Sequence, residues 1–203
     1  MRLPAGDSQL VQIMDVALEN AARKAGAWLG CRPGCTQCCH GAFAINALDT
    51  ARLQAGMKAL HAADTHKARV VEDRARAWIE EWGPEFPGDA ASGMLGTSEE
   101  EQARFEEFAN EAACPALDPA TGLCDVYAWR PMTCRVFGPP TRVDSGIGGG
   151  DALGCCDLCF VGASEDEIAA CEMPVPHELE EQLVRETGKD GETVVAFALC
   201  SGA

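Results

Sequence analysis

Cysteine is the residue type through which this sequence could do chemistry. Four of its twelve cysteines fall within nine residues, at Cys31, Cys35, Cys38 and Cys39. Thiolates are the soft ligands that zinc and iron–sulfur clusters select, and four sulfurs around one centre is the usual number. A free cysteine also behaves as a small buried hydrophobe, but a preference for burial does not produce such clustering. The run therefore predicts a loop that holds a metal ion.

The spacing within this run limits which thiols can share one ion. A turn at Gly34 would let Cys31, Cys35 and Cys38 point inward and leave Cys39 aimed elsewhere. Adjacent residues rarely ligate one ion with the same geometry. The Cys38–Cys39 pair therefore leaves open either two metal positions, or one ligand beside one packed thiol.

Two further groups of cysteines follow along the chain. The second group lies in a turn-rich segment and the third extends toward the C-terminus, and their members are Cys114, Cys124 and Cys134, then Cys155, Cys156, Cys159 and Cys171. For the third group, metal ligation, a redox-active dithiol and plain packing all stay open. Cys200 stands apart and is expected to be a buried small hydrophobe. His40, directly after the first run, is expected to be a hydrogen-bonding neighbour more often than a ligand.

Charge and hydropathy restrict the partners and the compartment. The chain carries 16 Lys and Arg against 32 Asp and Glu, for a net charge of −16, and it has no basic run. Nucleic acid and anionic membrane surfaces are therefore not expected as partners. Polar residues interrupt residues 9–29, so no signal peptide is predicted, and no segment has the roughly 20 apolar residues that span a bilayer. We expect a cytoplasmic protein whose thiols stay reduced.

The elements that must position these cysteines are mostly helical. Apolar residues recur at three- and four-residue steps over residues 9–29, which predicts a helix that ends near Gly30 and covers the first cysteine run. Other segments with helical periodicity or a serine–glutamate capping box predict helices over residues 49–60, 65–82, 98–112, 164–171 and 176–187. Residues 192–199 are ambiguous between a helix and a strand.

The segments between the helices are expected to be loops. Residues 84–96 are predicted to form an exposed loop, residues 114–137 a compact irregular structure, and residues 138–154 a flexible glycine-rich loop that lacks the features of a phosphate cradle. The predicted fold class is mainly α, with few or no strands. One domain over residues 1–203 would surround a loop-rich cysteine metal centre, with motif halves at 31–41 and 114–137, a helical insertion at 47–112 and a cysteine-rich extension at 151–203.

Part of this pattern is similar to a known family. The run Cys31-x3-Cys35-x2-Cys38-Cys39, followed by Cys114-Pro-x-Leu-Asp and by Gly122-x-Cys124-x2-Tyr127-x2-Arg130-Pro131-x2-Cys134-Arg135-x-Phe, resembles the YkgJ-type cysteine cluster family (CxxCxxCC) of zinc- or iron-chelating domains. A related region occurs in the flagellin lysine methylase. The resemblance implies that the cysteines of the first two groups are the metal-binding set, and that Tyr127, Arg130 and Pro131 shape the second loop. It supplies no reaction.

Three functions stay open on this basis. The first is a metal-binding protein whose zinc or iron holds the fold together or presents a surface to an unidentified protein partner. The second is an iron–sulfur protein that moves electrons or assists a modifying enzyme, as the methylase relationship suggests. The third is a thiol–disulfide relay through Cys155–Cys156 or Cys156-x2-Cys159.

The sequence does not identify an enzyme. The spacing of Cys31, Cys35 and Cys38 equals that of a radical SAM cluster loop, but the chain lacks the strand–helix repeat that those enzymes require. No nucleophile, base and orienting acid can be assembled, so no catalytic residue is named. Arg130 and Arg135 flank Cys134, where they could offset thiolate charge or pair with carboxylates.

Overall fold

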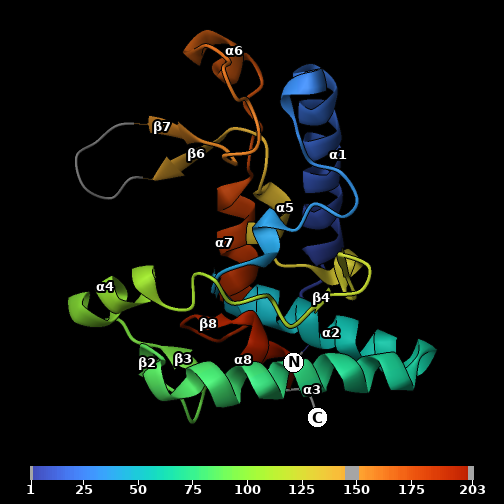
Figure 1. The fold of residues 1–203 in the computed structure, drawn as a ribbon, viewed down its shortest axis with the longest axis vertical. Coiled ribbons are helices and arrows are strands. Elements are labelled where there is room, and N and C mark those ends of the chain that lie inside the picture. The colour runs from blue at the N-terminus through green and yellow to red at the C-terminus, as the bar shows by residue number, and fades with distance from the viewer. Residues whose placement is uncertain (1, 145–150, 201–203) are drawn as a thin grey trace. The chain divides into compact units, whose positions relative to one another are not determined.

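A computed structural model describes residues 2–144 and 151–200 of the chain. Helices account for 54% of the structure and strands occur only as short pairs, so the predicted mainly α fold is confirmed (Figure 1). The chain divides into two compact units. Unit 1 comprises residues 1–4, 33–132 and 183–203, and unit 2 comprises residues 5–32 and 133–182. The single domain over the whole chain stays a prediction.

Three helices form the main core of unit 1. They are α2 (Ala47–Ala63), α3 (Thr65–Trp82) and α8 (Val195–Cys200). The Asn46 side chain caps α2 by accepting a hydrogen bond from Asp49 N, and the Asp64 side chain caps α3. These caps explain why α3 has its predicted bounds and why α2 is longer than the predicted 49–60. The helices bury Leu53, Met57, Val71 and Leu199, among others.

An aromatic cluster forms a second core in unit 1. Trp78 and Phe86 both contact the Phe108 ring edge-on, with ring centroids 5.9 and 5.8 Å apart. Phe86 is only 5% exposed, although residues 84–96 were predicted to form an exposed loop. That prediction holds for residues 89–92, which are exposed, and is wrong for Phe86 and its neighbour Pro87, which are buried. The segment contains a 3-10 turn, η3 (Gly83–Glu85), and a hairpin of β2 (Gly88–Asp89) and β3 (Met94–Leu95).

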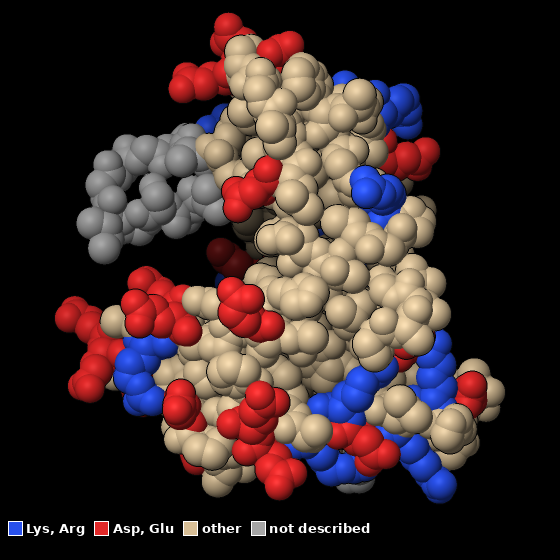
Figure 2. All heavy atoms as spheres, viewed as in Figure 1, with Lys and Arg blue, Asp and Glu red and all other residues tan. Residues whose placement is uncertain are grey.

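The remaining elements of unit 1 connect these cores. The capping box at Ser98 starts α4 (Glu99–Glu107) as predicted, and acidic side chains gather over this helix in Figure 2. The ambiguous segment near the C-terminus is first a strand, β8 (Thr193–Val194), which pairs with β1 (Ala44–Ile45), and then α8. Residues 117–129 form the β4 (Leu117–Asp118) and β5 (Leu123–Cys124) hairpin and the 3-10 turn η4 (Tyr127–Trp129).

Unit 2 is built on α1 (Asp7–Ala25), whose apolar stripe is buried at Leu10, Met14, Ala17, Ala21 and Ala25. The helix ends at Ala25, earlier than predicted, because Gly26 takes a positive φ of 52° and starts the 3-10 turn η1 (Gly26–Trp28). The capping box at Ser164 starts α6 (Glu165–Ala170) as predicted. The helix α7 (His177–Glu186) follows and crosses the division between the units in sequence, as α5 (Met132–Val136) does.

The prediction of a flexible loop over residues 138–154 is wrong at its two ends. Strand β6 (Thr141–Asp144) pairs with β7 (Asp151–Gly154) in an antiparallel hairpin. Backbone pairing creates this hairpin without the alternating apolar pattern that would have predicted it. The glycine run at 146–150 lies outside the described residues. Among the helices that the structure describes, none is both long enough and apolar enough to cross a membrane.

Candidate metal centre

The cysteines predicted as ligands are divided between the two units. Unit 1 contains Cys35, Cys38, Cys39, Cys114 and Cys124, and unit 2 contains Cys31, Cys134, Cys155, Cys156, Cys159 and Cys171. The four cysteines of the first run therefore do not all lie in the same unit, because the division falls between Arg32 and Pro33.

In unit 1, the first loop closes with the 3-10 turn η2 (Gln37–Cys39). The Cys39 amide donates a hydrogen bond to the Thr36 carbonyl at 2.8 Å. The His40 ring places Nδ1 3.0 Å from the same carbonyl oxygen, a distance at which the protonated nitrogen donates. His40 is thus the hydrogen-bonding neighbour that the sequence predicted.

Backbone contacts join this loop to the second motif half. The Cys114 amide donates to the Cys39 carbonyl at 2.7 Å, and the Gly41 amide donates to the Ala112 carbonyl at 2.9 Å. His40 and Ala113 form an antiparallel bridge between these two bonds. The two ends of the helical segment between the motif halves therefore lie side by side. This arrangement brings Cys38 and Cys39 close to the hairpin that contains Cys124.

The hairpin turn also touches the first loop. A Cβ built on Gly122 would lie 3.5 Å from Gly34 Cα and 3.6 Å from the Thr36 side chain. Gly122 has a positive φ of 68°, which an L side chain rarely adopts. The glycine allows the turn before Cys124 to approach the loop that contains Cys35.

The thiols in this region control one another's ionisation. The pKa of Cys38 is lowered to about 6, chiefly by a hydrogen bond from the Cys39 thiol and further by the positive charges of Arg130 and His40. The same bond, burial and the nearby sulfurs raise the pKa of Cys39 above its ordinary value. Burial raises the pKa of Cys114 to about 12 and also raises that of Cys124. One thiol therefore ionises readily, and the other three need an added positive charge.

A soft cation fits this donor set. All four thiols are free, and the charges of Cys38, Cys114 and Cys124 act on Cys39. A metal ion lowers the pKa of a thiol that coordinates it and binds thiolates in preference to thiols. Zinc and iron are suited to sulfur ligands, whereas magnesium and calcium select oxygen.

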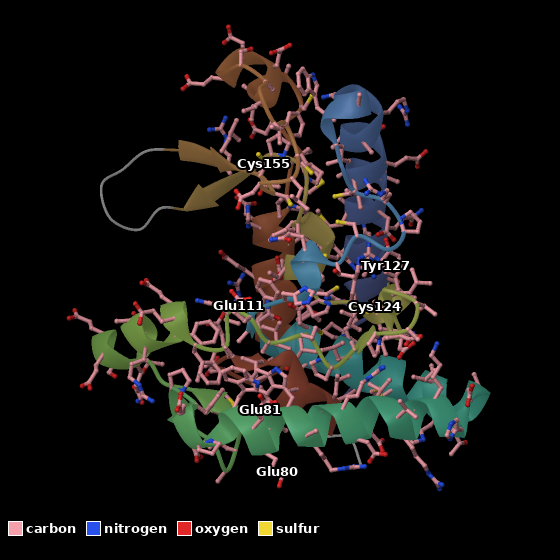
Figure 3. The ribbon with its side chains drawn as sticks, in the orientation of Figure 1. Glu80, Glu81, Glu111, Cys124, Tyr127 and Cys155 are labelled. Carbon is pink, nitrogen blue, oxygen red and sulfur yellow. The ribbon has the colours of Figure 1, made fainter. Side chains whose placement is uncertain are left out.

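The predicted supporting residues have different partners. The Arg130 guanidinium lies 4.0 Å from the centroid of the Tyr127 ring and donates to the Tyr127 carbonyl at 3.0 Å. Figure 3 shows Tyr127 near Cys124, on the turn that follows the hairpin. Arg135, in unit 2, is buried and pairs with Asp15 at 2.6 Å, so it makes the carboxylate pair that the sequence also allowed.

Residues on α3 that the sequence reasoning missed hold the cysteine hairpin. Arg74 donates through Nε to the Pro115 carbonyl at 2.9 Å and lies 2.5 Å from a carboxylate oxygen of Asp125. Lys67 Nζ lies 2.7 Å from the other oxygen of that carboxylate. Pro115 and Asp125 directly follow two of the cysteines. The seven-residue spacing of Lys67 and Arg74, which puts both on one helix face, is the only signal that could have indicated this role.

A second set of sulfurs lies in unit 2. The Sγ atoms of Cys31 and Cys159 are 3.9 Å apart. Cys155, labelled in Figure 3 just after β7, is close enough to Cys159 for their charges to interact. The structure thus places Cys31 against the third cysteine group and Cys39 against Cys38, which differs from the expected grouping of Cys31, Cys35 and Cys38.

The cysteine side chains do not form a complete coordination shell in this structure. In residues 2–144 and 151–200, no group of three or more His, Cys, Asp or Glu side chains is arranged to hold a metal ion. A cysteine side chain has a single torsion, and its sulfur moves by about 3 Å between staggered positions. The backbone therefore brings the thiols into one neighbourhood, and side-chain rotation is needed to complete a coordination shell.

Cys134, on α5, is half-buried.

The sequence matches one protein family over residues 30–144, described as "CxxCxxCC: Putative zinc- or iron-chelating domain". The match covers more than half of the chain and includes every cysteine of the first two groups. No curated protein matches the chain, and no solved structure does.

Proposed function

The chain belongs to the CxxCxxCC family of zinc- or iron-chelating domains, and from that premise we propose that unit 1 binds one zinc or iron ion through thiolates. The proposed ligands are Cys38, Cys39, Cys114 and Cys124. One observation carries this proposal: the 2.7 Å hydrogen bond from Cys114 N to Cys39 O, which joins the two motif halves at the four interacting thiols. Cys35, on the same loop, is the alternative ligand if one of these four does not coordinate the ion.

The protein's own residues prepare the site for a cation. Cys38, with a pKa of about 6, is ionised at neutral pH and offers the first thiolate. The other three thiols ionise when the bound metal supplies positive charge. Four thiolates around a divalent ion carry a net charge of about −2, which the buried Arg130 partly offsets. The carboxylate of Asp125, held by Arg74 and Lys67, fixes the hairpin and is not needed as a ligand.

The proposed role is structural chelation in the reducing cytoplasm. The metal would cross-link the two motif halves, which few backbone hydrogen bonds join. Thiolate ligands remain available in a compartment where thiols stay reduced. An iron–sulfur redox or accessory role is the second candidate, favoured by the additional free thiol of Cys35 on the first loop. The two candidates differ in inorganic sulfide and in colour.

Anaerobic purification followed by metal analysis, sulfide analysis and a visible spectrum tests the proposal. Zinc or iron without acid-labile sulfide is the expected result. A brown protein with acid-labile sulfide would replace the single ion with the iron–sulfur candidate. A preparation that takes up neither metal on reconstitution would refute both.

Two cysteine variants locate the ion. Cys114→Ser should lose it, because serine is a hard and poorly ionised ligand. Cys200→Ser is the matched control, since Cys200 is also half-buried in unit 1 while the charges near it are those of Arg76 and Glu72. Equal metal loss in the two variants would contradict the assignment.

A further inference from the structure

The sulfurs of unit 2 lie at a distance that suits a metal. The 3.9 Å between Cys31 Sγ and Cys159 Sγ is far longer than a disulfide bond of about 2.05 Å. Zinc–sulfur bonds of about 2.3 Å at tetrahedral angles place neighbouring ligand sulfurs about 3.8 Å apart. The pair therefore has the separation of two ligands on one edge of a tetrahedron.

Other thiols surround this pair. Cys155 interacts electrostatically with Cys159. Cys156 and Cys171 are each 6% exposed and belong to the same apolar cluster as Cys159. Cys155, Cys156, Cys159 and Cys171 therefore belong to one cluster of unit 2, and Cys159 is the member that contacts Cys31.

The backbone in this part of unit 2 is built for close approach. The Phe160 amide donates to the Trp28 carbonyl at 2.7 Å, which ties the segment before Cys31 to the segment after Cys159. A Cβ on Gly30 would lie 2.8 Å from the Leu158 carbonyl oxygen. A Cβ on Gly138 would lie 2.8 Å from Cys31 Sγ. The two glycines thus provide the space in which the sulfur-bearing segments meet.

The composition of this core indicates that a cross-link or a metal ion would stabilise it. Its buried members are Ala25, Cys156, Cys159, Phe160 and Cys171. Three of these five side chains are small thiols, which bury little apolar area, and small cores of this kind are commonly completed by a metal or a disulfide. The cysteine sulfurs of this core could act as the ligands of such a metal ion.

We propose that unit 2 holds a second thiolate-bound metal ion of the zinc class, with Cys31, Cys155 and Cys159 as ligands and Cys156 or Cys171 as the fourth. This centre is distinct from the one proposed in unit 1 and uses none of its ligands. Three of the four ligand positions lie beyond residue 144, outside the family match. The chain would then bind two ions.

Alkylation of the unaltered protein tests the centre without any substitution. Cys31 is the exposed cysteine of the set, so its thiol reacts readily with iodoacetamide when no ion is bound. In zinc-loaded protein its alkylation should slow by about tenfold or more, and a chelator should restore the rate. Equal rates with and without chelator would overturn the proposal.

Metal stoichiometry separates this proposal from that for unit 1. Reconstituted protein should hold two zinc ions, Cys31→Ser should lose one, Cys114→Ser should lose the other, and Cys200→Ser should lose neither. One ion that Cys114→Ser loses and Cys31→Ser retains would overturn the second centre and leave the first standing. One ion that only Cys31→Ser loses would do the reverse. One ion lost in both variants would mean a single shared centre and would overturn the proposal.

A redox pair is the remaining alternative outcome. Air oxidation followed by peptide mass spectrometry detects a Cys31–Cys159 disulfide. Its formation in protein that takes up no second ion would overturn the metal assignment. Cobalt substitution gives an independent positive result, because thiolate-to-cobalt absorption should fall by about half in Cys31→Ser.

Discussion

Arg74 is the residue whose removal should loosen the cysteine hairpin of unit 1 most directly. It donates to the Pro115 carbonyl at 2.9 Å and to the Asp125 carboxylate at 2.5 Å. The Asp125 side chain is only 3% exposed, so the loss of a hydrogen-bonding partner there is not readily replaced by water. Arg74→Ala would take away both hydrogen bonds and would keep the ion pair of Lys67 with that carboxylate.

The expected loss follows from the burial of these groups. A hydrogen bond to a charged group contributes about 1.5–3 kcal/mol, and a neutral one about 1 kcal/mol. Lys67, 2.7 Å from the carboxylate, retains part of the electrostatic stabilisation. We therefore expect Arg74→Ala to lower the free energy of unfolding by about 2–3 kcal/mol. For a chain of this size, that corresponds to a fall in Tm of about 4–12 °C.

Urea unfolding of the metal-free protein measures this effect, with Arg76→Ala as the matched control. Arg76 lies on the same helix and pairs with Asp73 at 2.9 Å, but its side chain is 56% exposed. An exposed pair contributes about 0–1 kcal/mol. A chromophoric chelator in competition with the protein should also show zinc affinity reduced by about 10–100-fold in Arg74→Ala only. If the two variants match in stability and affinity, Arg74 does not hold the hairpin.

Three further substitutions have defined outcomes. Ser98→Ala removes the capping box of α4 and should cost about 1 kcal/mol in urea unfolding, whereas an unchanged midpoint would mean that the cap contributes nothing. Gly56→Ala should cost about 1–3 kcal/mol in thermal unfolding, because its Cβ would lie 2.6 Å from the Trp129 side chain, and a stabilised variant would contradict that packing. The Thr121 hydroxyl and the Ala120 amide hold the pKa of Asp118 below its ordinary value. The stabilisation is therefore full above the pKa of the unfolded carboxyl and lost as pH falls through the lower folded pKa, so Asp118→Asn should weaken the acid dependence of Tm between neutral pH and pH about 2.

Local signals in the sequence were sufficient for much of the fold. The helix over residues 65–82 combines a cap at Asp64, a regular apolar face and Gly83-Pro84 at its end, and each signal acts within a few residues. The two capping boxes formed for the same reason. The glycine and proline content of segment 84–96 indicated exposure, which holds at residues 89–92, but it did not indicate the burial of the Phe86 ring against Phe108.

The sequence predicted that cysteines make up the candidate site, but it did not predict which cysteines lie close together. Clustered cysteines indicated thiolate chemistry, and the second motif half indicated where further ligands lie. The contact between Cys31 and Cys159 depends on the path of the chain over more than a hundred residues, which no spacing rule contains. The seven-residue spacing of Lys67 and Arg74 places both on one helix face, but it does not indicate that their partner is Asp125 on a distant hairpin.

The bond between Cys39 and Cys114 has a consequence for the timing of synthesis. The first loop leaves the ribosome well before the hairpin that completes its neighbourhood, because α2, α3 and α4 lie between them. At translation rates of about 5–20 residues per second, the interval from Cys39 to Cys124 is about 4–17 s. During this interval, the Cys38 and Cys39 thiols are on a nascent chain that lacks Arg130 and the Cys114 and Cys124 thiols. The four ligands proposed for unit 1 can therefore come together only after the hairpin has been synthesised.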